Sequence, residues 1–121
     1  MRTEEMNQGE KIPYIINENE KSIIFDEQVT VNLEDEQESS EKVVDIGLDR
    51  NSDLIKGKGK WYVANLVIPG EKFKLVDTGE VDEEGNKVLK KVKKELNLDD
   101  VELALWSLPD SYNNKNIGGV E

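Results

Sequence analysis

The residues best suited to chemistry are acidic, because the 121-residue chain contains no cysteine and no histidine. It therefore lacks thiolate nucleophiles, the usual zinc ligands and the commonest general base near neutral pH. A glycosidase-type pair of carboxylates is the remaining option, and Asp45 and Asp77 are its best candidates because they lie beside apolar runs. Most other acids occupy polar segments, and no base accompanies the few serines. We therefore expect a protein that is not an enzyme, with no catalytic residue.

The segment DRNSDLIKGKGK, Asp49 to Lys60, matches parts of two binding motifs. As a calcium loop it has Asp49, Asn51 and Asp53 at the first, third and fifth positions. Leu54, however, replaces the required glycine, and Lys60 replaces the bidentate glutamate. As a phosphate loop it lacks the long glycine spacing and the Lys-Ser/Thr pair. We expect neither a metal nor a cofactor, and interpret the segment as a turn.

Two apolar runs organise the predicted fold. WYVANLVIP, Trp61 to Pro69, has no charge and is rich in β-branched and aromatic residues, which favours a central strand covered on both faces. VELALWSLP, Val101 to Pro109, has a similar length, so the two strands could lie side by side. Trp106 and Leu108 would share one face of the second strand. That face is either covered by a sandwich partner or a helix, or kept for another subunit.

Shorter patterns predict further antiparallel strands. Tyr14 to Ile16 and Ile23 to Phe25 flank a turn-rich segment and indicate a hairpin, and Val29 to Leu33 alternates as a strand that is wet on one side. KVVDIGL, Lys42 to Leu48, is also strand-like. The acidic segment Glu34 to Glu41 has no apolar side chain and predicts an exposed loop.

A long hairpin is predicted in the second half of the chain. Lys72 to Val81 and Val88 to Leu96 flank the tight-turn sequence Glu84-Gly85-Asn86. The spacing of apolar residues in the second of these segments also fits a helix with a solvated lysine face. We favour the strand because the turn directly precedes it.

These patterns predict a mostly β protein, a small antiparallel sandwich or barrel-like domain with extended polar termini. The predicted organisation is a polar N-terminal arm at residues 1–11, a single β domain at residues 12–109 and a flexible C-terminal arm at residues 110–121. A chain of this length has room for one modest core.

The net charge of −11 is unevenly distributed. Residues 1–53 have a net charge of −10, residues 54–94 of +4 and residues 95–121 of −5. An acidic chain does not bind a phosphate backbone over a broad surface, so we expect no nucleic-acid partner. The basic middle could face the acidic part of a neighbouring copy, although the charge could also serve solubility alone. No apolar run approaches the ~18 residues of a membrane span, and no export signal is evident, so we expect folding in a cytoplasm and no membrane partner.

The order of elements carries one resemblance. IPYIINENEKSIIF, then GKGKWYVANLVIP, then a charged hairpin and LNLDDVELALWSLP resemble small structural proteins of the tails or baseplates of phages and phage-derived particles of Gram-positive bacteria. The resemblance covers roughly residues 12–109 and is one of pattern. It implies a non-enzymatic component of a virion or phage-like particle, folded in the host cytoplasm and present in several copies.

Under this interpretation, the partners are other particle proteins and copies of the chain itself, in a homo-oligomer. The expected interface residues are Trp106, Leu108, Tyr112 and Tyr14. Aromatic anchors commonly dominate the energetics of protein interfaces.

Two other functions stay open. A small protein with this charge could mimic nucleic acid and inhibit a DNA-binding protein. Alternatively, Trp61, Tyr62 and Trp106 could form the stacking platform of a carbohydrate-binding module. Their position within apolar runs instead favours a place in the core.

Overall fold

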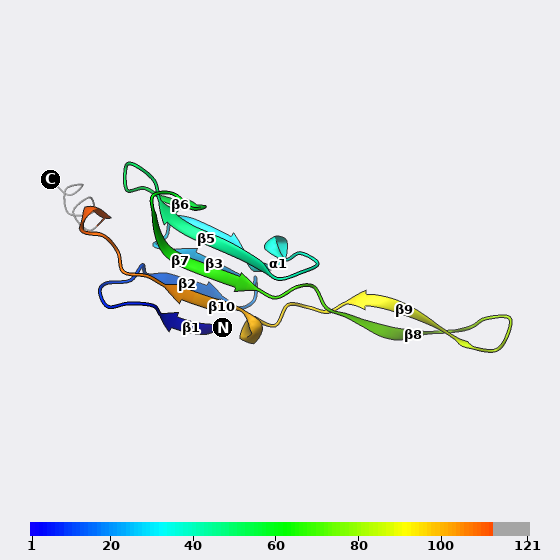
Figure 1. Cartoon of the computed structure of the whole chain (residues 1–121). Coiled ribbons are helices and arrows are strands. Elements are labelled where there is room, and N and C mark those ends of the chain that lie inside the picture. Colours follow the sequence, from blue (N-terminus) through cyan, green and yellow to red (C-terminus); the bar gives the residue numbers. More distant parts are fainter. Residues whose placement is uncertain (113–121) are drawn as a thin grey trace.

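Two β-sheets face each other, and one long hairpin projects from them (Figure 1). The structure is a computed structural model that describes residues 1–112. The prediction of a mostly β, small sandwich-like protein is confirmed: a five-stranded and a three-stranded sheet enclose the core, and all strand pairs but one are antiparallel in the part described.

The larger sheet brings together strands from across the whole chain. Its order is β1 (Arg2–Glu5), β10 (Glu102–Leu105), β7 (Trp61–Ile68), β5 (Lys42–Leu48) and β6 (Leu54–Lys56). β7 occupies the centre and pairs with β10, with Leu103 opposite Leu66, so the predicted adjacency of the two apolar runs is confirmed. β7 also pairs with β5, and a bulge in β7 opposite Ile46 and Gly47 interrupts that pairing.

The smaller sheet contains the predicted N-terminal hairpin. Its strands are β2 (Tyr14–Asn17), β3 (Ser22–Phe25) and β4 (Val29–Asn32), in that order. Alternate residues of each strand point towards the larger sheet, which gives the period of two seen in the sequence. Phe25, for example, lies opposite both Tyr14 and Val29 and is 0% exposed.

The core lies between the inward faces of the two sheets. The core contains mostly aliphatic residues. Each Å² of apolar surface removed from water contributes about 25 cal/mol, so their burial is the main source of stability. Its largest fully buried members are Phe25, Ile12, Ile23, Leu33, Ile46, Leu48, Leu66, Ile68 and Leu103.

The acidic segment after β4 is partly helical, which corrects the prediction of a strand to Leu33 followed by an open loop. α1 (Leu33–Glu36) is a single turn whose N-cap is Asn32. The Asn32 Oδ1 atom accepts a hydrogen bond of 3.1 Å from the backbone N–H of Asp35. Acidic residues in a first helical turn are electrostatically favourable, so this sequence suits a short turn. A second short turn, η1 (Leu98–Asp100), precedes β10.

The N-terminal segment differs from the predicted polar arm because it forms the edge strand β1. It pairs in parallel with β10, about 100 residues away in the sequence. All four side chains of β1 are exposed, so no apolar alternation marks the strand. Met1 packs against the core, and its amino group lies 3.7 Å from Asp99.

The C-terminal segment also departs from the predicted arm at its start. Residues 110–112 form a helical turn, and Tyr112 is only 2% exposed. The rest of the predicted arm, residues 113–121, lies outside the described residues.

The outer face of the five-stranded sheet is partly exposed, so the prediction that β7 is covered on both faces is wrong. Tyr62 is 40% exposed and Val43, which points outward from β5, is 54% exposed. Inward residues of β7 such as Leu66 are fully buried. A nearly continuous apolar run therefore forms a strand with only one covered face.

Candidate functional site: a projecting hairpin arm

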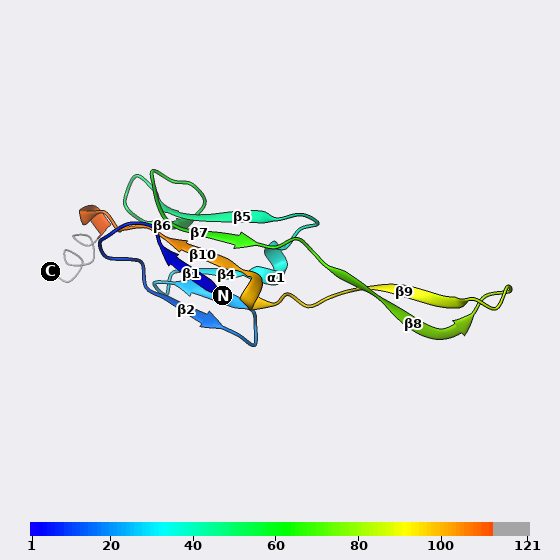
Figure 2. The same cartoon turned by 60° about the horizontal axis from the view of Figure 1, so that its bottom comes forward.

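The most distinctive feature of the molecule is the hairpin formed by β8 (Phe73–Val81) and β9 (Lys87–Lys93). Both views show it extending beyond the sandwich, at the opposite end from the turn at residues 110–112 (Figures 1 and 2). We call residues 72–94 the arm and the two packed sheets the body. The predicted hairpin is confirmed, and its second half is a strand rather than a helix.

The turn at the end of the arm is built around one carboxylate. The Asp82 Oδ1 atom accepts hydrogen bonds from the backbone N–H groups of Glu84 at 3.0 Å and Asn86 at 2.8 Å. Gly85 has a φ of +82°, a conformation that glycine adopts without steric cost. The sequence EEGN therefore closes the hairpin locally, without help from the body.

An irregularity interrupts the ladder halfway along the arm. The pairing shifts between Asp77 and Val81, and Gly79 in this stretch has a φ of +81°. The Asp77 side chain accepts a hydrogen bond from the Gly79 N–H at 2.8 Å, and the Thr78 hydroxyl donates to the Val88 carbonyl at 2.8 Å. Such bulges increase the local twist of a strand pair.

The register of the arm places apolar residues opposite lysines. Phe73 pairs with Lys93, and Leu75 pairs with Lys91. On the other face, Val76 pairs with Lys90. Neither face could pack against the body without burying lysine ammonium groups, which is costly. This pairing explains why the hairpin projects, and the lysines distributed along both strands are the sequence signal that could have predicted the projection.

Several large apolar side chains of the arm are consequently open to solvent. Every residue of β8 is exposed. The exposed fractions are 43% for Phe73, 67% for Leu75, 39% for Val76, 66% for Val81 and 51% for Leu89. A group of exposed apolar residues on one element is typical of a surface that contacts another protein.

Charge is segregated along the arm. We define the stem as residues 72–76 and 90–94, which contain six lysines and no acid, a net charge of +6. We define the tip as residues 77–89, which contain five acids and one lysine, a net charge of −4. The lysine-rich stem is thus one end of an element whose other end is acidic.

Most of the stem lysines have no anionic partner. Lys91 lies over the Phe73 ring at 4.3 Å, a cation–π contact, and Lys72 is 3.8 Å from Asp100. In the tip, Lys87 is 3.5 Å from Asp77. Within residues 1–112, the other stem lysines form no ion pair, and these are Lys74, Lys90, Lys93 and Lys94.

The root of the arm is held firmly by the body. The backbone N–H of Glu71 donates to the Glu38 carbonyl at 2.8 Å, and the Gln37 side-chain amide donates to the Pro69 carbonyl at 3.1 Å. A Cβ atom added to Gly70 would lie 2.8 Å from the Ser39 carbonyl oxygen, so glycine permits this close approach. The arm therefore leaves a rigid platform.

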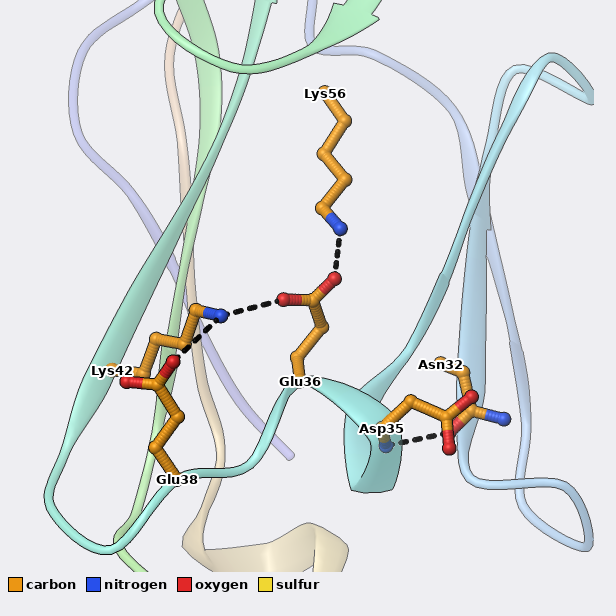
Figure 3. A network of polar contacts seen from close by, with 6 residues as sticks. All are labelled: Asn32, Asp35, Glu36, Glu38, Lys42 and Lys56. Atoms are coloured by element: carbon orange, nitrogen blue, oxygen red, sulfur yellow. Dashed lines mark hydrogen bonds and ion pairs between the residues drawn. The ribbon is translucent and has the colours of Figure 1, made fainter.

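A charged network fixes the segment that holds this root (Figure 3). The Glu36 carboxylate, at the end of α1, pairs with Lys42 at 2.9 Å and with Lys56. Lys42 also pairs with Glu38 at 3.2 Å. The Glu36 side chain is only 14% exposed, so these contacts join α1 to both β5 and β6.

The four interface residues predicted from the sequence occupy different environments. Tyr14 and Leu108 are half-buried and pack against the core. Trp106 lies on the outer face of the five-stranded sheet, where its indole N–H donates to Asn65 at 2.7 Å. Tyr112 is buried within its own chain, so its side chain has almost no surface to offer a partner. None of the four lies on the arm.

Tyr112 instead links the end of the described chain to the smaller sheet. Its hydroxyl donates to the Asp26 carboxylate and accepts a hydrogen bond of 2.9 Å from Gln28. The pKa of Tyr112 is raised from its ordinary value of 10.0 to about 12, first by burial and then by the hydrogen bond to Asp26 and the negative charge of that carboxylate. The contact with Gln28 lowers this pKa and opposes them.

The three aromatic residues considered for sugar stacking lie at the surface, which corrects the expectation that they belong to the core. Trp61 is 46% exposed, and its indole N–H donates to the Ser107 carbonyl at 3.0 Å. With their neighbours they line a shallow hollow of about 250 Å³. Its residues are Asn7, Lys60, Trp61, Tyr62, Trp106 and Ser107.

The acidic residues considered for catalysis are not brought together. Asp45 lies on β5 and accepts a hydrogen bond of 2.8 Å from Asn65. Asp77 lies on the separate arm sheet. In the described part of the chain, no group of three or more acidic residues is arranged to hold a metal ion.

No protein-family model, curated protein or solved structure matches the chain. Among the residues the structure describes, none of the helices has the length and apolar character needed to span a membrane.

Proposed function

We propose that the chain is a non-enzymatic assembly protein that joins copies of itself through the arm, as a component of a phage-tail-like particle. The observation that supports this proposal is the exposure of Phe73, Leu75 and Leu89 on an element that the body does not cover. The body provides the stable base, and the arm provides the contact.

The arm has little stability of its own. A lone two-stranded hairpin in water is marginally stable, because it buries little apolar surface. The arm is such a hairpin, attached to the body at one end only (Figure 2). Docking on another subunit would bury its apolar residues and order its side chains. A projecting hairpin of this kind suits assembly better than catalysis, for which reactive groups must be held in a closed site.

The particle context comes from the resemblance of residues 12–109 to tail and baseplate proteins. That context implies many copies at high local density, which favours weak contacts acting together. The expected partners are other copies and other particle proteins, and the expected location is the virion or phage-like particle.

Light scattering coupled to size-exclusion chromatography tests the proposal. In the shortened variant, residues 73–93 are replaced by Asn-Gly, since Lys72 and Lys94 are already joined by a backbone hydrogen bond of 2.8 Å. We expect the full chain to form oligomers and the shortened variant to be a folded monomer. A full chain that is monomeric at about 100 μM, where even weak specific contacts populate complexes, would contradict the proposal. So would a shortened variant with the same oligomeric state.

A carbohydrate-binding role is a second candidate, favoured by the surface position of Trp61, Tyr62 and Trp106. Both indole N–H groups are held by hydrogen bonds, which fixes the rings before any ligand arrives. Retention of the full chain on insoluble polysaccharides, lost in a Trp61→Ala variant, would support it. Equal retention of both proteins would refute it.

A further inference from the structure

We propose that the arm of one copy binds the arm of a second copy, antiparallel, so that each stem lies beside the other tip. This inference rests on the proposed function and specifies its contact. It concerns a self-complementary pair, in which the same surface of both subunits meets across a two-fold axis.

Charge complementarity is the first argument. The stem carries +6 and the tip −4, and each is about half of the arm. Parallel arms would set lysines against lysines and acids against acids. Antiparallel arms set each lysine-rich stem against four net negative charges. Four stem lysines have neither an ion pair nor a ring contact within the described chain, so they are available to a partner.

The positions of the apolar residues are the second argument. Asp77 is the midpoint of β8, which runs from Phe73 to Val81. A two-fold axis at this midpoint brings Phe73 of one arm beside Val81 of the other. Both side chains are exposed in the single chain, at 43% and 66%. The same axis that pairs opposite charges therefore also pairs apolar residues.

The free edges of the hairpin are the third argument. The arm sheet has only two strands, so β8 and β9 each have one unpaired edge. Unpaired edges commonly add strands from another chain, and lysines on an edge discourage unspecific pairing. The acidic tip of a second arm satisfies those lysines. A pair formed through the two β8 edges is closed by its two-fold axis, and each β9 keeps its free edge.

Charge reversal at stem and tip tests the proposal. The stem variant is Lys90→Glu/Lys93→Glu, and the tip variant is Glu83→Lys/Glu84→Lys. These positions avoid the turn-capping Asp82 and the Lys91–Phe73 contact. The stem variant lowers the stem charge from +6 to +2, and the tip variant changes the tip charge from −4 to 0. We expect the dimer dissociation constant of each variant to rise by about tenfold to a hundredfold, because the attraction between stem and tip is weakened or lost.

Mixing the two variants is the decisive measurement. The arms of the two variants carry net charges of −2 and +6 and keep one intact stem and one intact tip between them, so in a one-to-one mixture the heterodimer should bind more tightly than either homodimer. Body variants with the same charge changes are the matched controls. Lys58→Glu/Lys60→Glu and Glu18→Lys/Glu20→Lys should leave dimerisation within about twofold, as expected for exposed charges away from a contact.

The outcomes separate this inference from the proposed function. If the shortened variant is monomeric but the mixture stays monomeric, the arm binds another surface, and arm-to-arm pairing is wrong while arm-mediated assembly stands. If the shortened variant still dimerises, both proposals are wrong. Salt screens exposed charges that are more than about 10 Å apart at 0.1 M, and screening increases with concentration. The dimer should therefore weaken between about 0.05 and 0.5 M salt, and a dimer that does not weaken would also contradict the inference.

Discussion

The body and the arm are built from the same kind of strand but are stabilised differently. In the body, the inward-facing residues of the strands are buried between two sheets, as Phe25 and Leu66 show. In the arm, every residue of β8 is exposed, and apolar residues such as Phe73 and Leu75 pair with lysines rather than with each other. Alternation of apolar residues therefore predicts that a segment is a strand, whereas the residues opposite it in the neighbouring strand determine whether a face can be buried.

This difference assigns separate roles to the two regions. The body buries its inward apolar faces within one chain, although Tyr62 and Val43 stay exposed on its outer face. The arm keeps exposed apolar residues and lysines without an ion pair, so we expect its order to depend on what it contacts. Gly70 and Glu71, at the root of the arm, connect the two regions and contact the segment at Glu38 and Ser39.

Hydrogen exchange should show the largest difference between them. In the monomeric state, amides of β8 and β9 should exchange at least about a thousandfold faster than those of β7, because local opening costs far less than global unfolding. The exchange is measured by mass spectrometry on dilute protein at high salt, where we expect the monomer. Equal protection in both regions would show that the arm is stable by itself.

Truncating one core residue and one arm residue should separate stability from assembly. Phe25→Ala removes a fully buried ring and should cost about 3–5 kcal/mol in the free energy of unfolding. Leu75→Ala removes a 67% exposed side chain and should change that free energy by less than about 0.5 kcal/mol while weakening association. Urea denaturation and light scattering measure the two effects. A large stability loss in the arm variant would contradict the division of roles.

Local patterns allowed much of the fold to be predicted. The hairpins at Tyr14–Phe25 and in the arm follow from alternation and turn chemistry, which act over a few residues. The adjacency of β7 and β10 followed from their matched apolar runs. The strand β1 could not be predicted, since RTEE has no apolar residue and pairs with a segment about 100 residues away.

The candidate site was only half predictable. The hairpin was expected, but its projection depends on the register that places Phe73 opposite Lys93. The turn sets Val81 opposite Lys87, but the irregularity between Asp77 and Val81 shifts the register of the rest of the ladder, and local turn chemistry does not reveal that shift. For Tyr62 the error had a different cause: an apolar run does not reveal whether one sheet face lacks a covering layer.

Alkaline pH should weaken the body through Tyr112. Its pKa is about 12 in the folded chain and 10.0 ordinarily, so above pH 10 the unfolded chain loses a proton that the folded chain keeps. The stabilisation is complete below pH 10 and is lost as the pH rises towards 12. Tyr112→Phe should cost about 1–2 kcal/mol at pH 8, because it leaves Asp26 without its donor. Urea denaturation should show a smaller loss of stability above pH 10 in this variant than in the unmodified chain.

The smallest effect should come from the network that joins the two regions. Glu36→Gln removes the charge between Lys42 and Lys56 and should cost about 1 kcal/mol or less, as is typical of partly exposed ion pairs. Because Gln37 and Glu38 hold the root of the arm, the amide of Glu71 should exchange faster while β7 stays protected. Lys58→Gln, which also changes one charge at an exposed site, is the control. If Glu71 exchange does not change in Glu36→Gln, the network stabilises α1 without anchoring the arm, and the Gly70 contact with Ser39 alone fixes the root.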